Sequence, residues 1–325
     1  MILLTISPEI ECALNLTKRA APTITDTYDV PWFCLVTYLT EIVCHCTIIH
    51  VRYVVVSVDS LDQPRPSSTQ QYFETPNYLT VFAGTKEKQV YNEDFYQTRK
   101  GVHLYVGNSS YAKHPLVDHV VKDPVSLKYF VQDLYGIALN TGLLEVDDKF
   151  VWTAFVLPAP LYDWSLNDNQ RIEQIEEFRN KLEKNATGQA PCTVATYEPR
   201  TRALYLSKAV YIPAGFCRLA YCSFDIKACT KFPIRKYHLC FKTFGLIDMC
   251  PLERGAAMYC ESFGNRVVGF LTTALNCGRR NLPSVYTSLE FVHRLYKSLT
   301  NKDLENGPKK GDFKVPCSYL SPSQC

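Results

Sequence analysis

The residues of this chain with the most distinctive chemistry are its cysteines. There are fourteen in 325 residues, and most of them lie from Cys192 onward. Their spacings differ from the paired short spacings of zinc modules, which favours disulfides formed in an oxidising compartment. The run Cys44-His45-Cys46 offers thiolate and imidazole ligands, but no second ligand pair of fitting spacing accompanies it. We therefore expect no metal and no cofactor, with ligation by this run as the alternative.

Three glycosylation sequons, which begin at Asn15, Asn108 and Asn185, also favour an extracellular location. Each triplet alone is a weak signal, because such triplets arise by chance. The apolar start of the chain, residues 1–6, is too short for the apolar region of a signal peptide. We expect a secreted protein whose leader is missing from this sequence or whose export is unconventional.

Charge and hydropathy exclude several classes of partner. With 46% hydrophobic and 13% aromatic residues, the chain can bury a large core. The net charge is only +3 and the basic residues are scattered, so the sequence lacks the electrostatic footprint of a nucleic-acid binder or a membrane-surface protein. No apolar run approaches the roughly 20 residues that span a bilayer. Charge therefore names no partner, and we expect neither nucleic acid nor membrane.

The elements that must position these residues are mostly short β-rich runs separated by turn residues, a pattern typical of a β-sandwich or of β-barrels. The predicted strands are 33–38, 42–49, 53–58, 79–82, 102–106, 137–139, 151–157, 203–206, 210–212 and 267–271.

Two segments have helical periodicity. Residues 170–184 place Ile172, Ile175, Phe178 and Leu182 among charged residues, and residues 289–299 follow a candidate cap. The tail beyond is rich in Lys, Gly and Pro, and we expect it to be extended and stapled by its cysteines rather than packed.

The most specific motif lies near the carboxyl end. The stretch Cys250-Pro-Leu-Glu-Arg-Gly-Ala-Ala-Met-Tyr-Cys260 is followed by Asn276-Cys277-Gly278 and then by Pro283-Ser-Val-Tyr-Thr287. This order resembles the trypsin-family run in which Cys-x-Gly-Asp-Ser-Gly-Gly-Pro-Leu-x-Cys leads to Cys-Gly and Pro-Gly-Val-Tyr-Thr. The two cysteines that bracket the nucleophile loop keep the family's spacing.

Upstream motifs extend the resemblance. Cys44 followed by Arg52-Tyr-Val-Val-Val-Ser-Val-Asp-Ser-Leu61 is similar to the family's Cys…Arg-Trp-Val-Leu-Thr-Ala-Ala-His-Cys-Leu, and Pro31-Trp32 resembles the start of its first barrel. The resemblance to chymotrypsin/trypsin-family serine proteases implies an all-β fold of two six-stranded antiparallel β-barrels with a cleft between them. It covers residues 19–299, and the boundaries that it implies are an extension over 1–18, a first barrel at about 30–160, an inserted linker over 162–191, a second barrel at about 192–288, a terminal helix over 289–299 and a tail over 300–325.

The resemblance also implies that the catalytic positions are degenerate. Arg254 stands at the nucleophile position, Asp59 at the base position and Gly136 at the position of the orienting carboxylate. A guanidinium stays protonated in water and cannot form an acyl-enzyme. Leu252 replaces the oxyanion glycine, and loss of one such donor costs roughly 100–1000-fold in comparable enzymes. We therefore expect an inactive homologue, a pseudoprotease.

Two alternatives concern this cleft. In the first, an unrelated Ser-His-Asp set supplies hydrolase activity. In the second, Asp59 and Arg254 form an ion pair across the cleft and lock it, whereas otherwise the two side chains are solvated and point apart. The histidines available to the first alternative are His45, His50, His103, His114 and His119.

Two further features of the family are altered here. The former specificity pocket has Asp248 at its base, with Ala274 and Ser284 where family members usually have glycines, and the added side chains narrow it. Family members are activated by cleavage after a basic residue, and Lys18-Arg19 lies near the matching place, before Ala20. Whether this chain is cleaved after Arg19 is left undecided by the sequence.

By the same resemblance, disulfides are expected at Cys192–Cys260, Cys217–Cys240 and Cys250–Cys277. Cys34 and Cys46 fall opposite each other if the first hairpin turns near residue 40, and Cys222–Cys229 would close a small extra loop. Cys44 has lost its family partner, whose place is taken by Ser60. The remaining unassigned cysteines are Cys12, Cys317 and Cys325.

We consider three hypotheses of function. The first is a secreted non-catalytic homologue that binds proteins as a regulator, cofactor or decoy in an extracellular proteolytic pathway. The second is a structural component of an extracellular assembly, in which extra cysteines cross-link chains into disulfide-linked oligomers. The third is an active hydrolase that uses other residues. The insertion over 162–191 is the expected partner surface for the first two.

Overall fold

The computed structural model describes residues 23–38, 41–61, 76–84, 95–107, 119–120, 141–161, 168–185, 192–198, 202–224, 238–243, 254–264, 266–273, 282–305 and 307–314. Several expected site residues lie outside these ranges. They are Gly136, Asp248, Leu252, Ala274, Cys229, Cys250, Cys277, Asn15, Asn108, Arg19 and the unassigned end cysteines.

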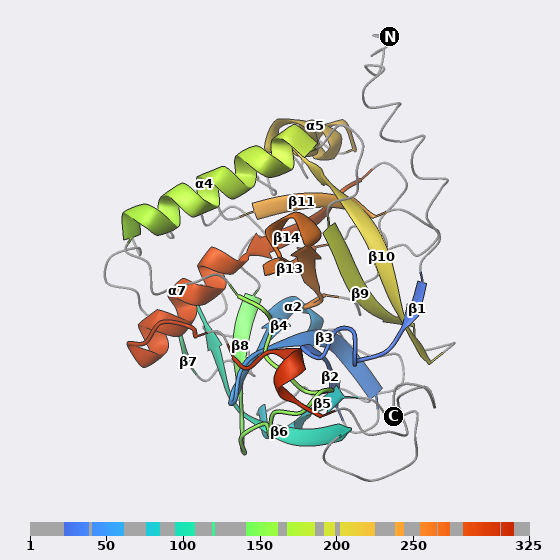
Figure 1. The fold of residues 1–325 in the computed structure, drawn as a ribbon, viewed down its shortest axis with the longest axis vertical. Coiled ribbons are helices and arrows are strands. Elements are labelled where there is room, and N and C mark those ends of the chain that lie inside the picture. Colours follow the sequence, from blue (N-terminus) through green and yellow to red (C-terminus); the bar gives the residue numbers. More distant parts are fainter. Residues whose placement is uncertain are drawn as a thin grey trace.

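The first barrel is a closed antiparallel sheet of six strands (Figure 1). Neighbouring strands pair in the order β5-β2-β3-β4-β8-β6, and β6 pairs again with β5 to close the barrel. A two-residue strand, β7, adds in parallel to β6. The strands are β2 (Phe33–Tyr38), β3 (Glu41–His50), β4 (Tyr53–Ser57), β5 (Leu79–Gly84), β6 (Tyr96–Val106), β7 (His119–Val120) and β8 (Thr141–Val146).

The second barrel is also closed by six antiparallel strands. Neighbouring strands pair in the order β10-β11-β14-β13-β12-β9, and β9 pairs again with β10 to close the barrel. A short strand near the amino end, β1 (Thr23–Thr25), pairs in antiparallel fashion with β10. The all-β double barrel expected from the sequence is confirmed. The strands are β9 (Cys192–Glu198), β10 (Ala203–Ile212), β11 (His238–Thr243), β12 (Ala257–Cys260), β13 (Arg266–Thr273) and β14 (Ser284–Ser288).

Few helices accompany the barrels. Both predicted helices are present, as α4 (Asp168–Asn185) and α7 (Leu289–Thr300), and α4 contains the asparagine of the third sequon at its end. No helix in the described ranges is long and apolar enough to cross a bilayer. The others are α2 (Val58–Leu61), η2 (Pro76–Tyr78), α5 (Ala214–Phe224), η6 (Glu261–Phe263) and η8 (Lys310–Asp312).

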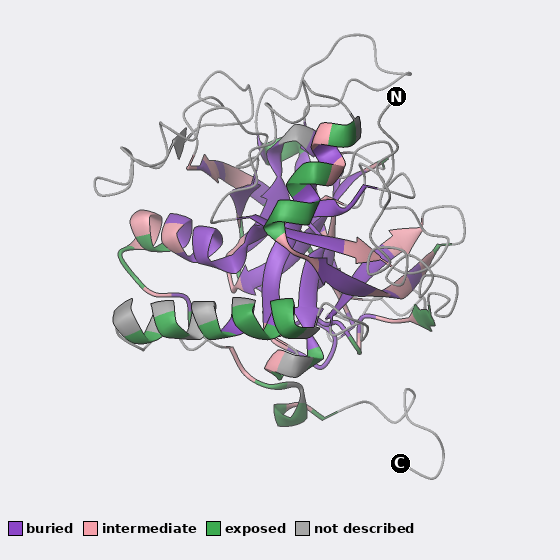
Figure 2. Cartoon of the chain, turned by 90° about the horizontal axis from the view of Figure 1, so that it is seen from above, coloured by how far each residue is buried: buried purple, intermediate pink, exposed green. Residues whose placement is uncertain are grey.

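Buried apolar side chains form a core inside each barrel and a third core at their junction. The junction core joins Trp32 and Phe33 of the first barrel to Tyr259 and Phe270 of the second, and the ring of Trp32 meets that of Tyr259 edge-on with centroids 5.4 Å apart. The buried face of α7 completes it, as the purple interior in Figure 2 shows. Burial on this scale favours a fixed placement of the two barrels.

The inserted helix α4 packs against the second barrel through one side. Phe178 and Leu182 are buried in the core of that barrel, and the Phe178 ring lies 4.1 Å from that of Phe263. Glu177 and Lys181 on the outer side form an exposed ion pair with Oε1 and Nζ 2.6 Å apart. The amphipathic pattern read from the sequence therefore corresponds to one buried and one solvated face.

Two expectations are wrong. Residues 151–157 are not a strand: the Thr153 N–H donates to the Val156 carbonyl at 3.0 Å, and the Thr153 hydroxyl accepts the amides of Phe155 and Val156, which closes a turn. Ala154, Phe155 and Val156 of this run are buried in the first barrel's core, which accounts for their apolar character. The start of the tail is packed, since Leu304 is buried in the junction core, whereas the tail's two cysteines lie outside the described residues.

Candidate functional site

The position that the resemblance gives to the nucleophile lies at the junction of the two barrels. Arg254 is half-buried and immediately precedes Gly255, whose N–H donates to the Leu271 carbonyl of β13 at 2.7 Å. Arg254 Nε is buried without a hydrogen-bond partner. Where an acyl-transfer enzyme needs a hydroxyl, this chain therefore carries a cation with a buried donor nitrogen.

Gly255 is held against strand β3 of the first barrel. Its φ of +95° is in the left-handed region, and a Cβ built on it would lie 2.2 Å from the His45 carbonyl oxygen. Its own carbonyl accepts a hydrogen bond of 2.9 Å from the Thr47 hydroxyl. Only glycine fits such a position without displacement of the backbone, so this turn sets how closely the second barrel approaches the first.

Cys44 is a buried free thiol, near enough to Arg254 for the positive charge to act on it. Burial raises its pKa to about 12, and a hydrogen bond from the Ser57 backbone and the positive charge of Arg254 lower it by less. Because the thiolate rather than the thiol is the nucleophile, Cys44 is unreactive at neutral pH. It does not replace the missing serine.

The base position is close to the same junction in the fold. Asp59 belongs to α2, which directly follows β4, and Ser57 two residues earlier contacts Cys44. Cys44 therefore links the Asp59 segment with Arg254, although the two are far apart in sequence. The side chain of Asp59 lies outside the described residues, so the ion pair with Arg254 stays a prediction.

Two of the candidate histidines bind backbone amides. Nε2 of His45 accepts the Tyr197 N–H at 3.3 Å, and burial lowers the pKa of His45 to about 3. Nδ1 of His50 accepts the Arg52 N–H at 3.3 Å, and its ring packs against Tyr53 and Tyr296. These contacts position structural imidazoles rather than a catalytic base.

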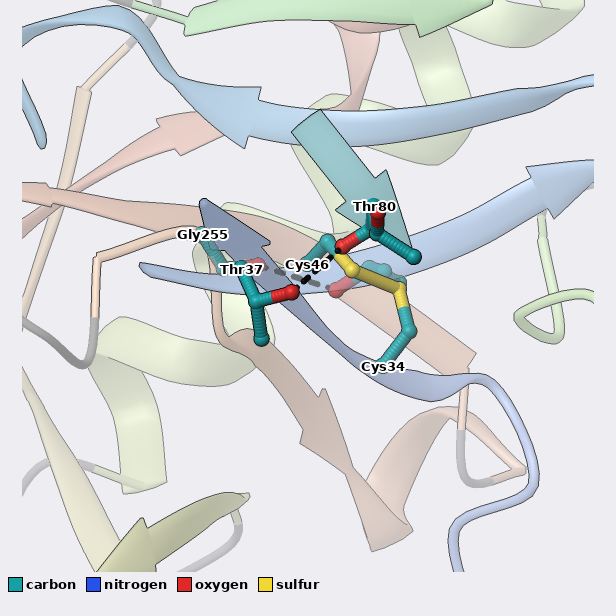
Figure 3. Close-up of a disulfide and its surroundings, with 6 residues drawn as sticks. Cys34, Thr37, Cys46, Thr80 and Gly255 are labelled. Atoms are coloured by element: carbon teal, nitrogen blue, oxygen red, sulfur yellow. Dashed lines mark hydrogen bonds between the residues drawn. A yellow bond between two sulfur atoms is a disulfide. The ribbon is translucent and has the colours of Figure 1, made fainter. Parts of the chain in front are cut away.

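The described cysteines form a disulfide frame within the barrels. Cys192–Cys260 joins β9 to β12, Cys217–Cys240 joins α5 to β11, and Cys34–Cys46 joins β2 to β3, close to Gly255 in Figure 3. These are the pairs named from the sequence. Cys222 is also disulfide-bonded, with a partner outside the described residues.

A disulfide removes one of the three possible metal ligands in the run of residues 44–46. Cys46 is held in a disulfide, so it cannot serve as a thiolate ligand. The described part of the chain also contains no group of three His, Cys, Asp or Glu side chains suited to a metal ion. Metal ligation by this run is therefore wrong.

One residue of the former specificity pocket is described. Ser284 starts β14, is buried, and lies opposite Phe241 of β11 in the sheet register. The side chain is part of the barrel wall, as expected where the family has glycine. The base of the pocket lies outside the described residues.

No protein-family model matches the chain, and no curated protein matches it either. Its assignment therefore rests on the fold and on the motifs quoted above. Two closed six-stranded barrels with disulfides and a terminal helix are consistent with a trypsin-like fold.

Sequence reasoning did not single out three residues that shape this junction: His45 as a contact between the barrels, Thr47 and Gly255. The glycine was noted only as part of a motif. A signal was present, because Gly255 keeps a glycine that the family motif has at the same place.

Proposed function

We propose that this chain is a secreted, non-catalytic serine protease homologue that acts by binding other proteins in an extracellular proteolytic pathway. The observation that supports this most is Arg254: the position that the resemblance gives to the nucleophile holds a guanidinium, and the nearby thiol of Cys44 is buried and protonated. Neither a guanidinium nor a protonated thiol attacks a carbonyl, which supports a role in binding rather than in catalysis.

The disulfides support an extracellular setting. Three pairs within the described residues tie strands or a helix to the barrels, and such frames persist in oxidising compartments.

Exposed apolar side chains on α5 support a role in binding. Phe216 is 47% exposed and Leu219 is 62% exposed, and they lie one helical turn apart on the same side. The outer faces of α4 and α5 stand out as exposed segments in Figure 2. Large exposed apolar side chains that cluster are typical of interaction surfaces.

Co-purification tests the proposal. The tagged protein, added to the extracellular fluid of the cells that produce it, is recovered and the accompanying proteins are identified by mass spectrometry. We expect a protease or a protease substrate to be retained by the native chain and by the control Lys309→Ala, at an exposed position outside α4 and α5, and to be lost in the double variant Phe216→Ser/Leu219→Ser. Recovery of cleaved peptides from a peptide library by the native chain would contradict the proposal.

A further inference from the structure

His45 forms a polar contact between the two barrels. It lies on β3 of the first barrel with 1% of its surface exposed, and its Nε2 accepts the backbone N–H of Tyr197 on β9 of the second barrel. An imidazole nitrogen that accepts a hydrogen bond carries no proton, so this contact requires neutral His45. Its Nδ1 is buried and has no hydrogen-bond partner.

The backbone of His45 also packs closely against the second barrel. The His45 carbonyl oxygen lies against Gly255, where a Cβ would approach to 2.2 Å. Two segments of the second barrel, β9 and the turn before β12, therefore meet the same residue from the side chain and from the main chain. A change at His45 acts on both.

Few groups near His45 can compensate a charge on it. On the β2 side, the Phe33 ring lies 5.1 Å from the imidazole. Within the described ranges, the charged and titratable neighbours in sequence or across the junction are Cys44, whose thiol is protonated, Arg254, which carries the wrong sign, and Tyr197 and Glu198 on β9. Glu198 is only half-buried, at the end of its strand.

We infer that His45 is an acid-sensitive lock between the barrels. Protonation removes the acceptor for the Tyr197 N–H, turns Nε2 into a second donor facing it, and places a charge in an apolar junction. The contact between β3 and β9 then opens. This inference holds whether or not the chain binds partners as proposed.

The covalent frame permits such an opening. Each disulfide whose two cysteines are described joins elements of one barrel: Cys34–Cys46 within the first, and Cys192–Cys260 and Cys217–Cys240 within the second. Separation of β3 from β9 leaves all three intact.

The direction and size of the effect follow from the titration. The ordinary pKa of histidine is 6.5, and burial lowers that of His45 to about 3 in the closed state. The contact is therefore fully stable above pH 6.5 and loses stability as the pH falls toward 3. Over this range His45 is neutral in the closed state and binds one proton in the open state. Each fall of one pH unit therefore raises the equilibrium constant for opening about tenfold.

Hydrogen exchange at the Tyr197 amide measures this opening. The protection factor, corrected for the intrinsic effect of pH on exchange, is measured between pH 6.5 and 4 in native protein. We expect it to fall about tenfold per pH unit. In His45→Gln, whose side-chain oxygen accepts the same N–H but does not titrate, it should be independent of pH. The control His103→Gln, at a half-buried position on β6, should behave as the native protein.

Two results overturn the inference: a native protection factor that does not change with pH, or the same slope in His45→Gln. If His45→Gln does not fold, the imidazole of native His45 is followed by NMR in isotope-labelled protein. A neutral ring down to about pH 4, with loss of Tyr197 protection over the same range, is the expected result. Titration near 6.5 without any change at Tyr197 contradicts the lock.

Discussion

The turn at Gly255 gives the sharpest test of how the barrels fit together. Replacement by alanine meets two obstacles, a φ of +95° and a Cβ that would lie 2.2 Å from the His45 carbonyl oxygen. A left-handed conformation costs a non-glycine residue about 1–2 kcal/mol. The contact is more than 1 Å closer than ordinary packing allows, and the backbone shift that relieves it costs about a further 2 kcal/mol. We expect Gly255→Ala to lower the free energy of unfolding by about 3 kcal/mol.

Gly264 provides the matched control. Its φ is +66°, but a Cβ there meets no atom within 4 Å. Gly264→Ala should therefore lose only the conformational part, about 1 kcal/mol. Urea unfolding at neutral pH, followed by circular dichroism, measures both variants. Equal losses would show that β3 does not press on Gly255 and would refute the packing described for the junction.

Two further predictions concern Cys44. Burial and its pKa of about 12 keep the thiol protonated, so Ellman's reagent should find no reactive thiol at Cys44 in native protein at pH 8 and should label it after unfolding in guanidinium. Fast labelling before unfolding is the contrary result. Ser60→Cys restores the family's partner to Cys44, and the new disulfide should raise the free energy of unfolding by about 3 kcal/mol for a loop of this length. Retention of the Cys44 thiol in that variant, seen by mass after alkylation, would argue against the trypsin-like alignment of β3 with α2.

Several strands of the first barrel can be predicted from the sequence because they are rich in β-branched and aromatic residues. The runs at β2, β3 and β4 are rich in Val, Ile and Tyr, and each was predicted to within one residue at each end. The helix α4 was predicted from its periodic apolar residues, of which Phe178 and Leu182 pack on the second barrel.

Other elements lack a local signal. β8 has Gly142 at its second position, where a Cβ would lie 3.1 Å from Leu104 and from Val58, so that close packing against the barrel rather than propensity makes this segment a strand. The apolar run at 151–157 has the signal of a strand but does not form one. Its central residues pack into the core, and the Thr153 hydroxyl accepts the backbone N–H groups of Phe155 and Val156 in a turn.

The candidate site could be predicted only as far as its chemistry is local. By the resemblance, the residue types at 59 and 254 predict the loss of a serine mechanism, and this stays a prediction. The role of His45 could not be predicted, because it depends on β9, whose contacting residue Tyr197 lies 152 positions away in the chain. Contacts between barrels are a property of the tertiary fold, and no short motif encodes them.

Intact-mass spectrometry after incubation with a fluorophosphonate probe tests the central claim most directly. Such probes form a covalent bond with an activated serine hydroxyl, and active trypsin treated in parallel serves as the positive control. With Arg254 at the nucleophile position, we predict an unchanged mass for the native chain at neutral pH. A stoichiometric adduct on any serine, lost after heat denaturation of the protein before labelling, would contradict the account.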